Sequence, residues 1–353
     1  MSSFCQPVSR LVRKKAFLIQ REYRAAIARS LGQPLIVEDI SALEKVEDTE
    51  VIVNVEACGI NASDILKCQG EYTEKQKLPF IPGFEVCGTV KQVGVKVEDF
   101  KPGDRVIGLN KEKLGGFAEE CALDQSDVWP ISKKVSFEEG AALLDTYATA
   151  LLCLHRRAKI TAKDTVLITA AAGGLGLAAV DLAANVYKAK VIGVCDTEEK
   201  ASIVRDKGAF AALKFDPKHL RDKIKDYTGK KGIKIILDAV GGDLFKEALK
   251  YVTHEGKVIV AGFASRQIPQ IMTSDLLPKS YSLIGVSLTH YRLADREVYR
   301  QVCNDVIELY QERLISPHVS KVFPLDEVNE AMEFIKLKKS TGKVVLSLAK
   351  NST

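Results

Sequence analysis

The glycine-rich run Ala170–Gly176 is the part of the sequence whose residue types most clearly point to chemistry. An apolar run, 165–169, precedes it and an amphipathic run, 175–187, follows it, so we expect strand, turn and helix in that order. Glycine allows the turn to be tight and lets backbone N–H groups approach an anion without hindrance from a Cβ. The helix N-terminus adds unpaired N–H donors and the positive end of the helix dipole. The run therefore predicts a dinucleotide site, with the pyrophosphate bound by Ala172, Gly173, Gly174, Leu175 and Gly176.

The end of the next expected strand, 190–195, bears on the choice between NAD and NADP. Asp196 lies 20 residues after Gly176 (196 − 176), the spacing of the acid that binds the ribose of NAD. Lys200 follows one helical turn later and can pair with the 2′-phosphate of NADP. An acid at a helix N-terminus is also typical of a charge that complements the dipole. Spacing alone therefore leaves both cofactors open.

Metal-binding patterns are weak in this chain. Eight cysteines form no C-x-x-C pair, so the closely spaced cysteines typical of a structural zinc site are missing. We interpret the cysteines as reduced thiols of an intracellular protein. The five histidines show no ligand spacing: His155, His219, His254, His290 and His318. We predict no metal site.

The elements that position these residues change in character along the chain. Short alternating strands with glycine turns dominate 23–135, and Gly88 is expected to separate strands 85–87 and 89–93. From Ser136 onward strands and helices alternate, which predicts a parallel sheet wrapped by helices. The expected strands are 165–169, 190–195, 211–214, 233–240 and 257–262, and the expected helices are 175–187, 198–207, 219–228 and 246–252. Helices at 296–311 and 328–336 and a strand at 343–348 complete the chain.

Composition sets outer limits on function. The 353 residues are 46% hydrophobic and 27% charged, which is typical of a globular chain of about two domains. The net charge is +5, but basic and acidic residues are interleaved, so we see no strong nucleic-acid signal. No apolar run is long enough to predict membrane insertion. The first 21 residues are basic and free of acids, as in a mitochondrial transit peptide or a frayed arm, so we expect a mitochondrial protein, with cytoplasm as the alternative.

Five segments, met in order along the chain, resemble the zinc-free quinone oxidoreductase family of the medium-chain dehydrogenase/reductase superfamily. They are 57–64 (ACGINASD), 78–90 (LPFIPGFEVCGTV), 100–106 (FKPGDRV), 116–119 (GFAE) and 146–150 (TYATA). The ending, 317–319 with 342–346, resembles the quinone oxidoreductase-like protein 2 group.

The resemblance implies an α/β architecture of two domains. A GroES-like, mostly β catalytic domain would span 23–145, an inserted Rossmann domain with a doubly wound parallel sheet 146–285, and 286–353 would return to the catalytic domain after a basic segment, 1–22. The resemblance favours NADPH, because Cys195 stands where NAD-using relatives carry an acid, and it implies a homodimer. Lys200 would bind the 2′-phosphate, while Phe215 departs from a tyrosine common in relatives. Further cofactor contacts would come from Thr197, Val240, Gly262, Phe263 and Lys343.

The resemblance also implies metal-free chemistry. Asn61 and Phe84 stand where zinc-using relatives place a cysteine and a histidine, and neither side chain replaces those ligands. We expect reduction of a small molecule, a quinone, by hydride from NADPH, with Asn61, Thr146 and Tyr72 as catalytic residues. The alternatives are reduction of an activated C=C bond, as in an enone, and a non-catalytic NADPH-binding protein.

Overall fold

The computed structural model describes residues 22–43, 45–216, 219–229 and 231–349. The predicted transit peptide, 1–22, lies outside these ranges except for Glu22. Within the described residues, no helix is both long and apolar enough to cross a bilayer.

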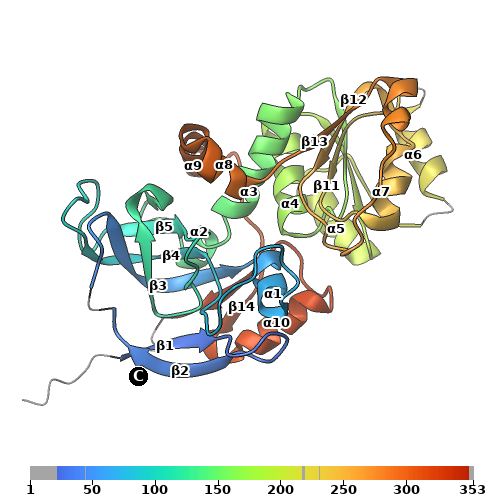
Figure 1. Cartoon of the computed structure of the whole chain (residues 1–353). Coiled ribbons are helices and arrows are strands. Elements are labelled where there is room, and N and C mark those ends of the chain that lie inside the picture. The colour runs from blue at the N-terminus through green and yellow to red at the C-terminus, as the bar shows by residue number, and fades with distance from the viewer. Residues whose placement is uncertain (1–21, 44, 217–218, 230, 350–353) are drawn as a thin grey trace, which may run out of the picture.

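The first lobe contains a seven-stranded sheet built from both ends of the chain (Figure 1). The last strand of the chain pairs with β3 (Glu50–Ile60), so the red and blue parts of the ribbon lie side by side. A separate antiparallel pair joins β1 (Glu22–Ile27) and β2 (Ile36–Ser41). The order is β14 (Val319–Pro324), β15 (Lys343–Ser347), β3, β4 (Glu85–Val93), β5 (Arg105–Leu109) and β7 (Val128–Pro130), with β6 (Glu120–Asp124) paired to β3.

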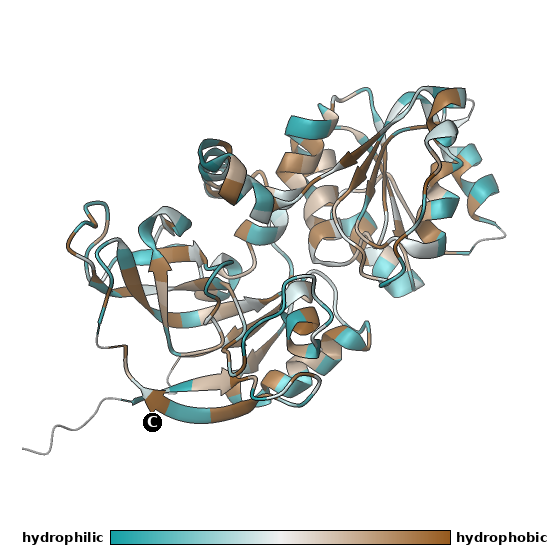
Figure 2. Cartoon of the chain, viewed as in Figure 1, coloured by the Kyte–Doolittle hydropathy of each residue, from teal (hydrophilic) through white to brown (hydrophobic). Residues whose placement is uncertain are grey.

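The second lobe contains a six-stranded parallel sheet. Its order is β10 (Ala211–Lys214), β9 (Lys190–Cys195), β8 (Thr165–Ile168), β11 (Ile233–Asp238), β12 (Val252–Val260) and β13 (Ser282–Gly285). This is the doubly wound order, in which the direction of winding reverses between β8 and β11. The strands are hydrophobic in Figure 2, as expected for a parallel sheet covered on both faces. The predicted α/β fold class is confirmed.

Helices of the second lobe follow the predicted alternation. They are α4 (Gly174–Asp181), α5 (Glu198–Asp206), α6 (Leu220–Thr228) and α7 (Gly242–Leu249). The bounds predicted for the helix at 246–252 are wrong, because the helix begins at Gly242 and Val252 is already the first residue of β12. The helix predicted at 175–187 changes to wider π-type turns over Leu182–Val186.

The predicted break at Gly88 is also wrong, because β4 runs through it without interruption. A Cβ at Gly88 would lie 2.0 Å from the carbonyl oxygen of Asn54 on β3. Glycine at this position therefore permits a close approach of two strands and does not mark a turn.

Helix α3 (Leu144–Leu151) joins the two lobes, and the predicted domain boundary at 145/146 falls inside it. It packs against α4 and against α9 (Arg296–Gln311), which follows α8 (Leu288–Ala294). Buried side chains of both lobes form one cluster here, including Phe84, Trp129, Ala148, Ile168 and Tyr299. The lobes therefore share a hydrophobic core along α3 and α9.

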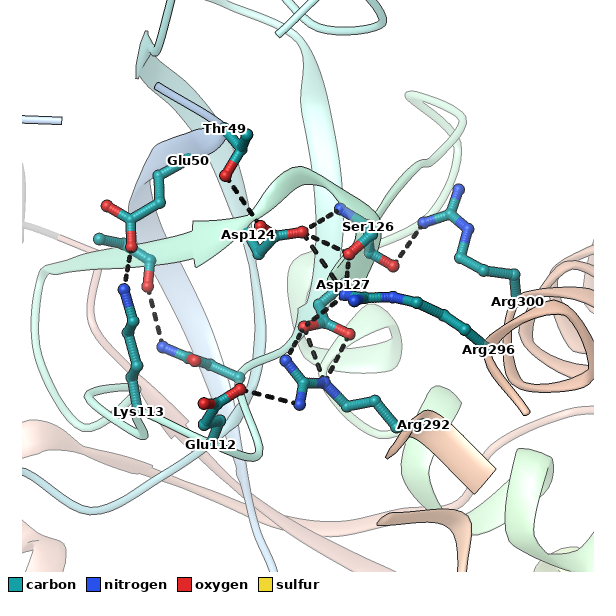
Figure 3. Close-up of polar contacts among 12 residues, drawn as sticks. Thr49, Glu50, Glu112, Lys113, Asp124, Ser126, Asp127, Arg292, Arg296 and Arg300 are labelled. Atoms are coloured by element: carbon teal, nitrogen blue, oxygen red, sulfur yellow. Dashed lines mark hydrogen bonds and ion pairs between the residues drawn. The ribbon is translucent and has the colours of Figure 1, made fainter. Parts of the chain in front are cut away.

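Three arginines of α8 and α9 fix these helices to the first lobe (Figure 3). The buried Arg292 guanidinium donates to the buried Asp127 carboxylate at 2.6–2.9 Å and to Glu112 at 3.0 Å. Arg300 donates to the carbonyl oxygens of Ser126 at 2.8 Å and Val128 at 3.0 Å. Arg296 reaches the same segment, but its side chain is 50% exposed.

Replacing Arg292 with Met should lower the free energy of unfolding by about 3–5 kcal/mol, because it leaves the Asp127 carboxylate buried without its partner. Arg296→Met is the matched control, since Arg296 faces the same carboxylate at 3.9 Å from a half-exposed position. It should cost at most about 1 kcal/mol. Urea unfolding followed by Trp129 fluorescence measures both, and equal losses would contradict the assignment.

Candidate functional site

The glycine turn lies between β8 and α4, at the carboxyl edge of the sheet where the winding reverses. A Cβ on Gly176 would lie 2.2 Å from the Ala170 carbonyl oxygen, whereas one on Gly173 would lie 3.3 Å from the same atom. The first helical bond runs from the Leu177 N–H to the Gly173 carbonyl at 2.8 Å. Helix geometry therefore leaves the N–H groups of residues 174–176 directed ahead of α4, as an anion requires.

The residues predicted to surround the adenosine end lie at the ends of the neighbouring strands β9 and β10. Burial raises the pKa of the Cys195 thiol to about 11, so this side chain is uncharged at neutral pH. Thr197 is the N-cap of α5, where its hydroxyl accepts the Lys200 N–H at 3.3 Å. Phe215 is half-buried, and its N–H donates to the Cys195 carbonyl at 2.7 Å.

Lys200 already has two partners. Its ammonium donates to the Asp196 carboxylate at 3.0 Å and to the Lys338 carbonyl at 2.6 Å. Asp196 is thus neutralised by the same lysine that was predicted to bind a 2′-phosphate. The Lys338 contact also connects α5 to the first lobe, beyond the end of α10 (Val328–Lys336).

On the other side of the turn, the ends of β8 and β11 are joined by Asp238, which sequence reasoning missed. Its buried carboxylate accepts the Thr169 hydroxyl at 2.6 Å and the Gly241 N–H at 2.8 Å. Burial raises its pKa, and these hydrogen bonds oppose the rise. Asp238 shapes the loop that carries Val240.

The Val240 carbonyl accepts the Ser265 hydroxyl at 2.6 Å, which ties the segment after β11 to the segment after β12. Gly262 and Phe263 lie in that second segment. A Cβ on Gly262 would lie 3.5 Å from the Ala239 carbonyl, and Phe263 is 39% exposed. The two predicted residues therefore lie on the same edge of the sheet as the glycine turn.

The C-terminal strand brings a lysine to this turn from the first lobe. The Gly342 N–H donates to the Ala172 carbonyl at 2.8 Å, and Gly342 forms an isolated β-bridge with Gly173. The aliphatic part of Lys343 consequently passes over α4: its Cδ would lie 3.4 Å from a Cβ built on Gly174.

Thr146, on α3, lies against the same glycine. Its methyl group would be 3.3 Å from a Cβ on Gly174. Its hydroxyl is buried, and among the described residues it has no hydrogen-bond partner. A buried hydroxyl without a partner is costly, so the arrangement favours a ligand that supplies one.

The Lys343 ammonium is buried between an amide and a carboxylate. It donates to Asn61 Oδ1 at 2.6 Å and to Glu85 Oε2 at 2.7 Å, and Asn61 Nδ2 donates to the same Glu85 oxygen at 3.1 Å. The other Glu85 oxygen accepts the Asp145 N–H at 2.9 Å. Sequence reasoning identified Asn61 and Lys343 separately, but missed Glu85 and the contact between the three.

Other charged groups next to this cluster are also held by protein partners. The buried Asp64 carboxylate accepts the Asn61 N–H at 2.8 Å, and burial raises its pKa to about 6. Lys111 pairs with Asp145, and its ammonium lies 4.2 Å from the centre of the Phe84 ring. The phenyl ring at position 84 thus contacts a cation through its face.

Tyr72 is half-buried just after α1 (Ala62–Gln69), with the Lys67 ammonium 5.1 Å from its ring centre. Burial raises the pKa of its hydroxyl. The structure therefore places the ring of Tyr72 against the Lys67 ammonium.

The side chains around Lys343 lack the donor set that a zinc ion requires. Among residues 22–43, 45–216, 219–229 and 231–349, no group of three or more His, Cys, Asp or Glu side chains could hold a metal ion. Asn61 and Glu85 both accept hydrogen bonds from the Lys343 ammonium, and the neighbouring Phe84 offers no ligand atom. These residues do not fit a zinc site. The glycine turn, the Thr146 hydroxyl and Lys343 do fit a dinucleotide.

Two domain families and several solved structures are similar to this chain. Residues 47–133 match the alcohol dehydrogenase GroES-like domain, and residues 174–308 match the zinc-binding dehydrogenase domain. Among solved structures, mycobacterial Rv1454c complexed with NADPH is similar with a TM-score of 0.85 and 28% identity, over 92% of this chain and 99% of that one. The Escherichia coli quinone oxidoreductase complexed with NADPH has a TM-score of 0.81 and 26% identity, over 92% and 99%.

Curated relatives are similar over nearly their whole length. A quinone oxidoreductase-like protein 2 homolog of Nematostella vectensis is 44% identical over 93% of this chain and 90% of its own. The Bos taurus quinone oxidoreductase-like protein 2 is 42% identical over 93% of both chains, and the human quinone oxidoreductase is 33% identical over 93% and 99%. The predicted resemblance is confirmed: this chain belongs to the quinone oxidoreductase family of the medium-chain dehydrogenase/reductase superfamily.

Proposed function

We propose that this chain is an NADPH-dependent oxidoreductase that reduces quinones without a metal ion. The observation that carries the proposal is the Thr146 hydroxyl, which is buried beside the first turn of α4 and the side chain of Lys343 and finds no hydrogen-bond partner among the described residues. The names of the relatives support a quinone as substrate, and two similar solved structures contain NADPH. The homodimer and the mitochondrial location stay predictions.

The phosphate groups of NADPH would be bound by backbone and lysine donors. The N–H groups of residues 174–176 would bind the pyrophosphate, and Lys200 would exchange part of its contact with Asp196 for the 2′-phosphate. Cys195 supports this choice, because a neutral thiol at the end of β9 does not repel the phosphate. Val240, Gly262 and Phe263 line the sheet edge toward the nicotinamide.

The protein's part in the reaction is positional. When bound, NADPH supplies the hydride, and a quinone accepts it without a Lewis acid because its carbonyl carbons are already electrophilic. The Thr146 hydroxyl would orient the nicotinamide end, while Lys343 and Glu85 fix both ends of the Asn61 amide. The second bond of the Asn61 Nδ2, to the Gly59 carbonyl, is long at 3.5 Å, so this N–H could exchange it for a substrate oxygen. Tyr72 lines the substrate side, and solvent supplies the proton that completes the hydroquinone.

Turnover tests the proposal directly. Purified protein mixed with NADPH and a panel of ortho- and para-quinones should oxidise the cofactor, which is followed by the loss of its absorbance. Turnover of enones, with products identified by mass spectrometry, and not of quinones would favour reduction of an activated C=C bond. Tight NADPH binding without turnover of either class would favour a non-catalytic protein.

Lys200→Met should weaken NADPH binding about 10- to 100-fold, because a charge-assisted bond to phosphate contributes about 1.5–3 kcal/mol. NADH lacks the phosphate, so its affinity should stay near that of the unmodified chain. Calorimetry with NADPH and with NADH measures the two affinities separately. A similar loss for NADH and NADPH would show that Lys200 acts on the fold and not on the 2′-phosphate.

Gly176→Ala should abolish NADPH binding, because its Cβ would lie 2.2 Å from the Ala170 carbonyl and displace the turn. Gly285→Ala, in β13 of the same lobe, is the matched control, since a Cβ there would meet no atom within 4 Å. Binding is measured by calorimetry, with circular dichroism to compare folding. Retained affinity in Gly176→Ala would contradict the proposed phosphate site.

A further inference from the structure

One arginine crosses from the second lobe to the first beside the proposed nicotinamide end. The Arg266 guanidinium lies 2.7 Å from Glu71 Oε2 through Nη1, and its Nη2 donates to Gln69 Oε1 at 2.7 Å. Arg266 follows β12 in the second lobe, whereas Gln69 ends α1 in the first. The bridge therefore connects residues 197 positions apart across the two lobes.

The first-lobe end of this bridge is rigid. Gly70 ends α1 in the left-handed conformation, with a φ of 73°, and its N–H donates to the Lys67 carbonyl at 3.1 Å. The Glu71 N–H donates to the Leu66 carbonyl at 2.9 Å, which completes a Schellman cap. Both acceptors of Arg266 are thus held by the end of a helix.

The second-lobe end is a short loop, 262–267, which contains Gly262 and Phe263. The Ser265 N–H and the Gly242 N–H bind the carbonyl oxygens of Val240 and Gln267 at 3.0 and 2.9 Å, so the loop is tied to the segment after β11. Arg266 itself has a φ of 63°, and its N–H donates to the Phe263 carbonyl at 2.8 Å. A tight turn therefore directs its side chain toward α1.

The two sides of the lobe interface differ greatly in strength. At α8 and α9, the buried Arg292–Asp127 pair lies next to a shared hydrophobic core. At the Arg266 bridge, the two side chains are 53% and 43% exposed. Exposed ion pairs break far more easily than buried ones, so the lobes should separate at Arg266 while α8 and α9 stay together with the first lobe.

We propose that Arg266, Glu71 and Gln69 form a latch that holds loop 262–267 closed over bound NADPH and slows its release. This inference rests on the proposed function, because it assumes that NADPH binds between the lobes. Arg266 is a positioning residue: it acts through the loop that carries Phe263 and through Glu71, the neighbour of Tyr72. A single guanidinium group, that of Arg266, thus connects loop 262–267 to the segment that follows α1.

The test compares Arg266→Gln, Glu71→Gln and the double variant in the full chain. The control is Arg24→Gln, because Arg24 pairs with Asp326 at a similar exposure, 40% and 62%, but within one lobe. Stopped-flow displacement measures the NADPH dissociation rate, and thermal unfolding measures stability. Amide hydrogen exchange without cofactor measures opening of loop 262–267.

Each single variant should release NADPH about 1.5- to 5-fold faster, the range expected for loss of an exposed ion pair. The double variant should be no faster than either single variant, the control should match the unmodified chain, and the unfolding temperatures should agree. Loop 262–267 should exchange faster in both single variants.

The latch would be overturned if Arg266→Gln left the NADPH dissociation rate unchanged. It would also be overturned if the rate increases of the two single variants multiplied in the double variant. If the unmodified chain bound no NADPH, the proposed function would fail. Hydrogen exchange would still show whether Arg266 and Glu71 keep loop 262–267 closed. Exchange unaltered by either substitution would then overturn the latch.

Discussion

The site depends on the buried ammonium group of Lys343, a residue far along the chain from both the glycine turn and Asn61. Lys343 enters from the C-terminal strand, crosses Gly174 and ends between Asn61 and Glu85. A buried charge is tolerated only when it is paired and hydrogen-bonded, and here a carboxylate and an amide oxygen supply both. The same lysine therefore determines where the first lobe, the glycine turn and Asn61 lie with respect to one another.

This arrangement explains why β15 must belong to the first lobe and still contact the second. Strand β15 pairs with β3, which carries the chain to Asn61, while Gly342 at its start binds the Ala172 carbonyl. Gly342 has a φ of 57°, and a Cβ there would lie 2.2 Å from the His318 carbonyl. Glycine thus permits the close packing that places the following lysine over α4.

The remaining lobe contacts divide into a buried set and an exposed set. The buried set, at α3, α8 and α9, combines apolar packing with the Arg292–Asp127 pair, whereas Arg266 and Lys200 reach the first lobe through more exposed polar bonds. Buried packing resists separation far more than exposed polar contacts do. A cofactor that must enter and leave is therefore expected to use the exposed side of the interface.

The sequence alone determined the features that depend on neighbours in the chain. Strand, glycine turn and helix at 165–187 follow from periodicity and from the absence of a Cβ at Gly173, Gly174 and Gly176, and the alternation after Ser136 predicted a parallel sheet. The role of Gly88 was misread, because a glycine in a turn and a glycine under a neighbouring strand look identical in one sequence.

Only the tertiary structure decided which side chains from distant parts of the chain contact one another. Lys343 meets Glu85 and Asn61 across 258 and 282 residues, Arg266 meets Gln69 across 197, and Asp127 meets Arg292 across 165. Local patterns encode how a segment folds, but no spacing rule connects side chains that the packing of distant strands and helices brings together. For this reason Asn61 and Lys343 were each found from a family motif, while Glu85 and the hydrogen bonds that join the three side chains became apparent only in the fold.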